Sequence, residues 1–414
     1  MNVLLHTFGC KANQYDTEVV RQLLEDAGCA VVDDPAAADA AVVNSCTVTH
    51  VGEAKLRALV RRLARRNPSV RTVVMGCAAA RDDGRLAALP NVAAVVGGAD
   101  AGAVARSLGV GAAAEDGLRR FASGSRAWLK VQDGCDEHCT FCATVLARGR
   151  GRSRPPADLV REAAALARAH AEIVLTGVHI GTYGRDTGGP ALSGLLARLI
   201  ERVDGVRFRL SSVEATEVDA GLVDLMARSP DRLAPHLHAP LQSGSDALLR
   251  RMGRHWYTSA GYRAAIERLA ERVAPLGLGA DVMVGFPGES AADHAATRRL
   301  VEALPFTYLH VFPYSAREGT AAVRLGPPAE AAAVRERAAE LRAIGAAREA
   351  RHRAGRAGAR ADLVLEARRA AVREAVTEDY LTALVPADAP WVVGRARVAA
   401  RLVARGPALW AEAA

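Results

Sequence analysis

The sequence predicts an α/β protein in three parts: an N-terminal α/β domain with a parallel sheet, a partial (β/α)6 barrel and a small C-terminal β-barrel. Short apolar runs alternate with amphipathic helical stretches through residues 1–110, and the alternation starts again in residues 126–354. Such alternation is typical of parallel sheets that are covered by helices. From residue 355 to residue 414, short strand-like runs replace the helical periodicity, which predicts a β-barrel appendage.

The first part is expected to hold four strands with helices between them. The expected strands are 3–7, 40–44, 72–75 and 93–96, and the expected helices are 17–27 and 53–66. Residues 111–125 are rich in small and polar residues, so we expect a linker there.

The second part is expected to contribute six strand–helix units, followed by a long helix over 329–353. Its expected strands are 127–131, 172–175, 207–210, 236–239, 280–284 and 308–312, and its clearest helices are 157–170 and 259–273. In the tail we expect strands at 362–366, 380–385, 391–393 and 395–402.

The chain of 414 residues has a net charge of +8, and nearly all of its basic residues are arginines. Arginine pairs well with phosphate, which favours a nucleic-acid partner, although a GC-rich genome enriches Arg and Ala in the same way. No run of 18 apolar residues occurs, and the first residues do not resemble a signal peptide. We therefore expect a cytoplasmic protein that does not enter a membrane.

Seven cysteines, an odd number, argue against a disulfide framework and favour metal binding. Cys10, Cys46 and Cys77, here called the strand-end triad, each follow a predicted strand. Because the carboxyl ends of parallel strands meet at one edge of a sheet, these thiols are expected to converge. The alternative is that they are three small buried residues. Cys29 has no such placement and is expected to be an ordinary core or surface residue.

Three more thiols, Cys135, Cys139 and Cys142, lie within eight residues and are called the loop triad. A zinc ion would need a fourth ligand, but His138 directly precedes Cys139, and a second cysteine pair is missing. A cubane iron–sulfur cluster fits better, because three thiolates then leave one iron open. The strand-end triad also offers three thiolates, so the sequence predicts two such clusters, each with one open iron.

The six predicted barrel strands are each followed by a polar or glycine-bearing segment, which predicts a site at one mouth of the barrel. Ordinary turn chemistry is the competing explanation for any one of these loops. Arg148, Arg150 and Arg152 follow the loop triad and are expected to contact RNA phosphates, unless they form a solvated basic loop.

The loop triad, with aromatic Phe141 before its last cysteine, resembles the radical S-adenosylmethionine (SAM) superfamily. The segments TFGCKANQYDTE, NSCTVTH and MGCAAAR resemble the methylthiotransferase family, and so do LTGVHIGTYGRD, HLHAPLQSGSDALLRRMGR, DVMVGFPGES and HVFPYSAREGT. The resemblance runs from residue 1 to about residue 350, and the tail would correspond to the family's small RNA-binding TRAM domain.

The resemblance implies that the loop triad holds a 4Fe-4S cluster whose open iron binds SAM, as the radical source. It implies that the strand-end triad holds an auxiliary 4Fe-4S cluster that presents sulfur, and that a second SAM donates the methyl group. The resemblance also implies that Gly177, Ser212 and Glu214 bind SAM, although turn chemistry is a competing explanation for each of them. Phe141 is expected to pack near the bound adenine, unless it simply fills the barrel mouth.

Within the family, GCKANQ, NSCTVTH and QDGC followed by ARGRGRSR look most like the enzymes that act on N6-threonylcarbamoyladenosine at tRNA position 37. The expected partners are thus a tRNA anticodon loop, a reductant such as flavodoxin or ferredoxin, and a sulfur donor. The alternatives are a methylthiotransferase for isopentenyladenosine-37 or for a ribosomal protein, a non-catalytic iron–sulfur sensor that binds RNA, and a zinc-bound structural protein.

Overall fold

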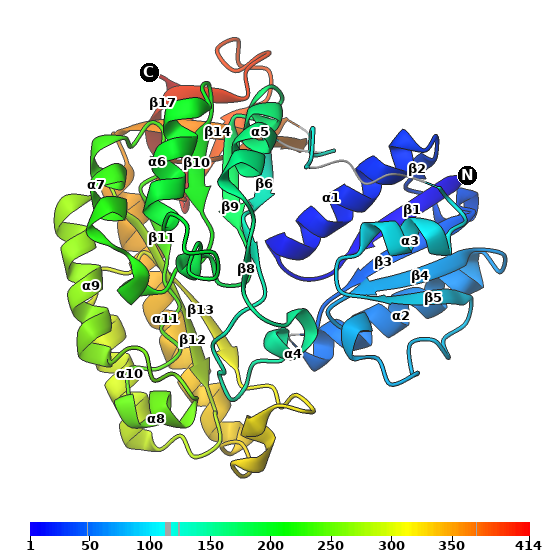
Figure 1. The fold of residues 1–414 in the computed structure, drawn as a ribbon. Helices are drawn as coiled ribbons and strands as arrows, with labels where there is room; N and C mark the ends of the chain where they lie inside the picture. Colours follow the sequence, from blue (N-terminus) through cyan, green and yellow to red (C-terminus); the bar gives the residue numbers. More distant parts are fainter. Residues whose placement is uncertain (48, 112–116, 123–124, 370) are drawn as a thin grey trace.

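The computed structural model describes residues 1–47, 49–111, 117–122, 125–369 and 371–414. Within them, an N-terminal α/β domain lies beside a partial barrel, and a closed five-stranded barrel follows at the C-terminal end of the chain (Figure 1). The predicted fold class is confirmed. Of the predicted linker over 111–125, residues 112–116 and 123–124 lie outside the described residues.

The N-terminal domain is built on a five-stranded parallel sheet with the order β2-β1-β3-β4-β5. All residues of the central strand β3 are buried, because helices cover both faces of the sheet. One core contains side chains of α2, and a separate core contains side chains of α1 and α3. The elements are β1 (Asn2–Thr7), α1 (Lys11–Asp26), β2 (Ala30–Val32), β3 (Ala40–Ser45), α2 (His50–Arg66), β4 (Arg71–Gly76), β5 (Val92–Gly97) and α3 (Ala101–Ser107).

Six parallel strands form the partial barrel, and all six predicted strands are confirmed. Two isolated bridges, Phe208 to Leu233 and Ser212 to His238, join the β6-β9-β10 sheet to the β11-β12-β13 sheet. The strands are β6 (Arg126–Lys130), β9 (Glu172–Thr176), β10 (Arg207–Leu210), β11 (His236–His238), β12 (Gly277–Val284) and β13 (Tyr308–Pro313). The helices are α5 (Pro156–Ala167), α6 (Leu192–Arg202), α7 (Ala220–Arg228), α8 (Asp246–Arg251), α9 (Ser259–Arg272) and α10 (Ala291–Ala303).

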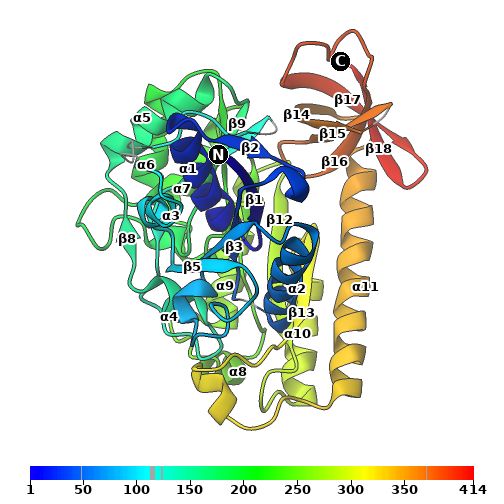
Figure 2. The same cartoon turned by 90° about the vertical axis from the view of Figure 1, so that its right-hand side faces the viewer.

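The long helix α11 (Ala331–Arg356) runs alongside the partial barrel and leads into the C-terminal barrel (Figure 2). That barrel is closed in the order β14-β15-β16-β18-β17. Its strands are β14 (Arg360–Arg369), β15 (Val372–Val376), β16 (Thr382–Pro386), β17 (Arg397–Arg405) and β18 (Ala408–Ala413). The prediction of a strand at 391–393 is wrong, because these residues form a turn whose Val392 fills the small core. The sequence also failed to predict β15 and β18.

The C-terminal barrel packs on the amino-terminal ends of the partial barrel's strands. Arg207 at the start of β10 contacts Asp362 of β14 at 2.9 Å, and Arg209 donates to the backbone carbonyl of Glu378 at 3.1 Å. The opposite mouth, where the loops after the strands lie, therefore stays clear of this domain. No helix in the described residues is long and apolar enough to span a membrane.

The N-terminal domain docks against the partial barrel through α1 and β6. Trp128 of β6 donates from Nε1 to Oε1 of Gln14 at 2.6 Å, and Arg154 donates to the hydroxyl of Tyr15 at 2.9 Å. A second contact pairs Arg317, after β13, with Glu53 of α2. This docking turns the carboxyl ends of the N-terminal strands toward the loops at the mouth of the barrel.

Candidate active site

The strand-end triad gathers at the carboxyl edge of the N-terminal sheet. Cys10 follows β1 and occupies the residue before α1, where its thiol makes no capping hydrogen bond. Cys46 follows β3 and Cys77 follows β4. Gly9, with φ of +106°, leaves the space between them open, because a Cβ there would stand 3.2 Å from Sγ of Cys46. The predicted convergence of these thiols is thus present.

Asn13, one helical turn after Cys10, contacts two of the three thiols of this triad. Its Oδ1 lies 3.7 Å from Sγ of Cys10 and 3.9 Å from Sγ of Cys77. Its Nδ2 donates to the carbonyl of Ser45 at 2.9 Å, which ties the start of α1 to the end of β3. Burial raises the pKa of the Cys77 thiol, neighbouring Arg148 opposes this, and Cys10 and Cys46 add to it.

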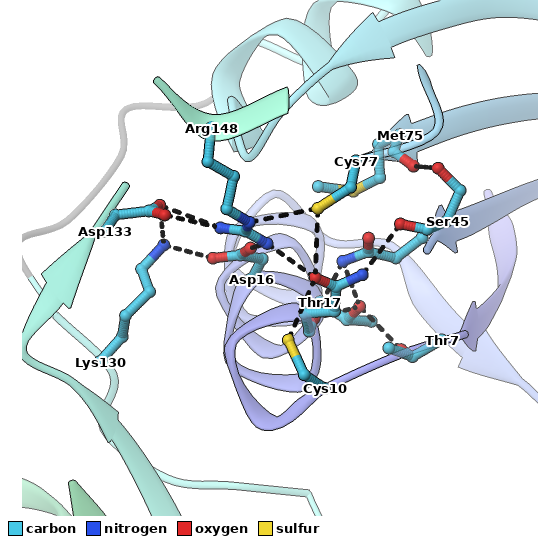
Figure 3. Close-up of polar contacts among 12 residues, drawn as sticks. Thr7, Cys10, Asp16, Thr17, Ser45, Met75, Cys77, Lys130, Asp133 and Arg148 are labelled. Carbon is cyan, nitrogen blue, oxygen red and sulfur yellow. Dashed lines mark hydrogen bonds and ion pairs between the residues drawn. The ribbon is translucent and has the colours of Figure 1, made fainter. Parts of the chain in front are cut away.

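The prediction that Arg148 contacts an RNA phosphate is wrong, because this side chain is buried. Its side chain is only 3% exposed, and its guanidinium lies between the two domains (Figure 3). It donates from Nε to Sγ of Cys77 at 3.2 Å, to Asp16 of α1 at 2.8 Å and to both carboxylate oxygens of Asp133 at 3.0 Å. Because Asp16 and Asp133 neutralise its charge, this arginine is not available to a nucleic acid.

Backbone hydrogen bonds fix the loop triad at the mouth of the barrel. The amide of Cys135 donates to the carbonyl of Gly149 at 3.0 Å, and the amide of Thr140 donates to the carbonyl of Met252 at 2.8 Å. The short strand β7 (Gln132–Asp133) comes before the loop, and α4 (Thr144–Arg148) comes directly after it. The next strand, β8 (Arg152–Ser153), pairs with β7 and so closes the segment. The three thiols therefore sit on a loop that is held at both ends.

Two basic side chains contact the loop triad. His179 Nδ1 lies 3.4 Å from Sγ of Cys135, and its Nε2 lies 3.0 Å from Glu217. Burial disfavours the charged imidazole, but these two hydrogen bonds outweigh burial and raise the pKa of His179 to about 10. Arg254 donates to Sγ of Cys139 at 3.4 Å, while burial raises the pKa of that thiol to about 12.

A cavity of about 590 Å³ opens beside the loop triad and is called the first cavity. Phe141, Ser212 and Glu214 line it, and Thr49 contributes from the N-terminal domain; that the first three bind a cofactor stays a prediction. Gly177 is outside this lining, although the next two residues belong to it, because Gly177 packs on the backbone of Gln132.

Four residues that line the first cavity carry a buried polar atom without a hydrogen-bond partner among the described residues. These atoms are Glu214 Oε2, Gln242 Oε1, Trp256 Nε1 and Tyr314 OH. Buried polar groups are normally paired, so such a group of unpaired atoms marks a place for a polar ligand. Glu214 is held in place by Arg254, which donates to it at 2.5 Å.

Comparisons with known proteins agree with this geometry. Residues 2–98 match a model described as "Uncharacterized protein family UPF0004", and residues 129–301 match the radical SAM superfamily. Threonylcarbamoyladenosine tRNA methylthiotransferase MtaB of Bacillus subtilis is 38% identical over 342 residues, which are 78% of this chain and 75% of that protein. The Thermotoga maritima protein of the same name is 37% identical, over 78% of this chain and 77% of that protein.

This chain belongs to the radical SAM methylthiotransferase family. A tRNA-2-methylthio-N(6)-dimethylallyladenosine synthase of Dictyoglomus thermophilum, from the same family, is 32% identical over 76% of both chains. Among solved structures, the radical SAM methyltransferase TsrM of Kitasatospora setae has the same fold, with a TM-score of 0.57, 15% identity, and coverage of 75% of this chain and 72% of that one.

Membership in this family implies SAM and one 4Fe-4S cluster, and the first cavity fits both. Thiolates are the usual ligands of such clusters, and the loop triad offers three of them at the cavity wall. The four unpaired polar atoms suit the amino, carboxylate and ribose groups of SAM. The volume of about 590 Å³ is typical of a pocket for a molecule of that size.

Sequence reasoning missed Asn13, Asp16, His179 and Arg254. Asn13 had a usable signal, since it follows Cys10 by one helical turn, and His179 lies in one of the six polar loops. Arg254 had no local signal, because its partner Cys139 is 115 residues away.

Arg150 and Arg152 remain exposed, so their predicted contact with RNA stays a prediction. The Arg150 side chain is 92% exposed and pairs loosely with Asp136. Arg152 donates to the backbone carbonyls of Arg150 and Arg148, which shapes the loop.

Proposed function

We propose that this protein adds a methylthio group to C2 of N6-threonylcarbamoyladenosine at position 37 of tRNA. The observation that carries the proposal is the meeting of two cysteine triads at one domain interface, joined through Arg148. The substrate follows from the relatives, since four curated proteins named for this reaction are 34–38% identical to the chain.

In this proposal the loop triad ligates the 4Fe-4S cluster that binds SAM, and the strand-end triad ligates an auxiliary 4Fe-4S cluster. Residues 1–110 and 126–354 then form the two domains that bring these clusters together, with 111–125 as their connection and 355–414 as the TRAM-like domain. When bound, the clusters and two molecules of SAM supply hydrogen abstraction from an unactivated C–H bond, sulfur and a methyl group.

In this proposal, side chains of the protein bind SAM and stabilise the thiolates that ligate the cluster. Glu214 and Ser212 would bond the amine and ribose hydroxyls of SAM, and Phe141 would pack near its adenine; all three line the first cavity, which supports these roles. Arg254 and His179 each lie within hydrogen-bonding distance of a loop-triad sulfur, which stabilises negative charge on a ligating thiolate. Gly177 allows the backbone of the neighbouring loop to approach closely.

The substrate and partners complete the proposal. The adenine in an anticodon loop is unpaired and can be turned out into a pocket at low cost. Arg150 and Arg152, at the edge of the mouth, are proposed to contact its phosphates. A one-electron reductant such as flavodoxin or ferredoxin and a sulfur donor are required for turnover.

Nucleoside mass spectrometry tests the proposal in a host that lacks this modification. Expression of the chain should produce 2-methylthio-N6-threonylcarbamoyladenosine, and Cys139→Ala and Cys46→Ala should each abolish it. Each variant should also lose about four of roughly eight irons per chain, because one cluster remains in each. Cys29→Ala, outside both triads, is the matched control and should keep product and iron.

Other outcomes separate the alternatives. If only the isopentenyl product appeared, the chemistry would stand and the assigned substrate would be wrong. If an iron-loaded protein gave no thiomethylated nucleoside, methylthiolation of a ribosomal protein or an RNA-binding sensor would become the better explanation.

A further inference from the structure

A smaller cavity of about 150 Å³, called the second cavity, adjoins the first one inside the partial barrel. Ser212 and Asp281 line both cavities, so the two are neighbours. Tyr380 of the C-terminal barrel closes the second cavity at the amino-terminal end of the strands, and Lys11 of α1 borders it from the N-terminal domain. All three domains thus contribute to this space.

The charges around the second cavity favour an anion. Lys11, Arg126 and Arg209 line it, against one carboxylate, that of Asp281. Arg209 is already paired with Glu172, and Arg126 pairs with a glutamate of β14.

Unlike the two arginines, Lys11 has no hydrogen bond or ion pair from its ammonium to any of the described residues. Its ammonium lies over the ring of Trp128, with 5.9 Å between Nζ and the ring centroid. An unpaired, half-buried cation beside a cavity offers a site for an anionic oxygen.

Asp281 does not neutralise Lys11, because it is occupied by two imidazoles. His238 Nε2 lies 3.0 Å and His310 Nδ1 lies 3.3 Å from its carboxylate. The ligand atoms of these three residues lie within 4.8 Å of one another, which is a spacing that a metal ion accepts. However, the unpaired ammonium of Lys11 lines the same small space and repels a divalent cation, so the charge balance favours an anion over a metal.

The remaining wall of the second cavity is formed by aromatic rings with polar atoms. His236 stacks on Tyr380 with ring centroids 4.3 Å apart. The hydroxyl of Tyr308 lies 2.9 Å from Nε2 of His236 and 3.1 Å from Nδ1 of His238. Such a wall suits a short polar substituent that has a planar part next to a hydroxyl and a carboxylate.

We propose that the second cavity holds the threonylcarbamoyl group of the substrate, with Lys11 bound to its carboxylate. The inference rests on the proposed function and specifies how the substrate is recognised. The C2 and N6 positions of adenine lie on its Watson–Crick edge, so a base that presents C2 to the first cavity directs its N6 substituent into the adjoining space. The volume equals about five water molecules at about 30 Å³ each, which suits the amino-acid part and excludes a second base.

Lys11 thereby becomes a specificity residue. An isopentenyl substituent is uncharged and gains nothing from an ammonium group, whereas the threonylcarbamoyl carboxylate gains a charge-assisted hydrogen bond. A backbone phosphate of tRNA could supply the same anionic oxygens, so the experiment must separate the two sources.

The test measures binding of anticodon stem-loops to the full-length, iron-loaded protein by fluorescence anisotropy under anaerobic conditions. Three stem-loops are compared: one with N6-threonylcarbamoyladenosine, one with its methyl ester and one with unmodified adenosine at position 37. We expect the acid to bind the wild-type protein about tenfold more tightly than the ester, which is the effect of one hydrogen bond to a charged group. Lys11→Met should remove this difference, and Lys11→Arg should retain part of it.

Lys55→Met is the matched control, because Lys55 is exposed on α2, away from both cavities. Lys55→Met should change the affinities for all three stem-loops by the same factor, so the difference between the acid and the ester should remain. If Lys11→Met weakened the three stem-loops equally, Lys11 would contact a phosphate and the inference would be overturned.

The inference would also fall if the wild-type protein bound the acid and the ester equally, and this comparison needs no variant. If the wild-type protein still formed the thiomethylated threonylcarbamoyl nucleoside in that case, the proposed function would stand alone. If it formed none, the proposed function would fall as well.

Discussion

Arg148 and Cys77 form a hydrogen bond across the interface between the two domains, with 3.2 Å between Nε of the arginine and Sγ of the cysteine. The same guanidinium binds both carboxylate oxygens of Asp133, two residues before the first cysteine of the loop triad. One side chain therefore touches a thiol of one triad and the base of the loop that carries the other (Figure 3). This buried cation adds to the docking contacts of Trp128 and Arg154 and links the two triads directly.

If the strand-end triad holds the proposed auxiliary cluster, replacing Arg148 by Gln should shift the reduction potential of that cluster to a lower value. Hydrogen bonds to ligating sulfurs favour the reduced form, and a tenfold loss of that preference corresponds to roughly 60 mV for one electron. Removing the cation also leaves Asp16 and Asp133 less well compensated, so the free energy of unfolding should fall by about 3–5 kcal/mol.

Redox titration followed by electron paramagnetic resonance measures that potential in the anaerobically purified protein. Arg150→Gln is the control, because this neighbouring arginine is 92% exposed and touches no thiol. An unchanged potential in Arg148→Gln, at full iron content, would contradict a role for this arginine beyond structural support.

The backbone at Gly134 gives a second prediction, which concerns the loop triad. Gly134 has φ of +74°, and a Cβ there would stand 1.9 Å from the carbonyl oxygen of Arg150. Gly134→Ala should therefore displace the loop and abolish iron binding at the loop triad. Gly149→Ala is the matched control: it has φ of +70°, but its Cβ would meet nothing closer than 3.7 Å. Because φ of +70° with ψ of −155° is a conformation that side chains rarely adopt, we expect this variant to lose about 1–3 kcal/mol of stability and to keep the iron.

Iron content and visible absorbance distinguish the two glycine variants. Equal iron loss in both would mean that positive φ alone, rather than the contact with Arg150, decides the shape of the loop.

The two cysteine triads were predictable from the sequence, because each signal is local. Three thiols within eight residues are visible directly, and the other three each follow an apolar run that reads as a strand. The six barrel strands were predictable for the same reason, since alternating apolar and helical segments depend on neighbours in the chain.

The start of α1 was not predictable, because its polar residues are buried for a functional reason. The sequence predicts a helix from residue 17, yet the helix begins at Lys11, and Asn13 and Asp16 are only 1% and 3% exposed. Their partners, Cys77 and Arg148, come from distant parts of the chain. A polar run with such partners looks like a loop when only its neighbours are considered.

Arg148 was assigned wrongly for the same reason. In the run ARGRGRSR it resembles Arg150 and Arg152, and nothing local separates a buried arginine from exposed ones. The distinction depends on Asp16, which lies 132 residues earlier in the chain.

Arg150 supplies a third prediction, on tRNA binding. If it contacts a phosphate in the anticodon loop, Arg150→Ala should weaken binding of every stem-loop and lower the salt slope of log Kd by about 0.7. Binding measured at several salt concentrations gives this slope. Arg161→Ala serves as the control, because Arg161 is an exposed arginine on α5 that pairs with Asp158. Equal slopes in the two variants and in the wild-type protein would assign Arg150 to the solvated surface.

The last prediction concerns Glu172, which is fully buried between Arg207 and Arg209 where the C-terminal barrel docks. Burial disfavours its charged form, but Arg209 and Arg207 outweigh burial and lower the pKa of Glu172 to about 2. A carboxylate whose folded pKa is depressed stabilises the fold above its unfolded pKa of about 4.3. That stability, on the order of 3 kcal/mol, is lost as the pH falls from about 4.3 toward 2.

Denaturant unfolding at several pH values between 7 and 2 measures this effect, as the difference between the wild-type protein and Glu172→Gln. The variant should lose about 3–5 kcal/mol at neutral pH, because buried Arg209 loses its carboxylate partner and buried Arg207 keeps only that of Asp362. Its stability should then fall less steeply than that of the wild-type protein over the acidic window. Glu201→Gln is the control, since Glu201 is 69% exposed and should leave the profile unchanged. Parallel profiles for the wild-type protein and Glu172→Gln would mean that Glu172 is not the group whose protonation loosens the C-terminal barrel.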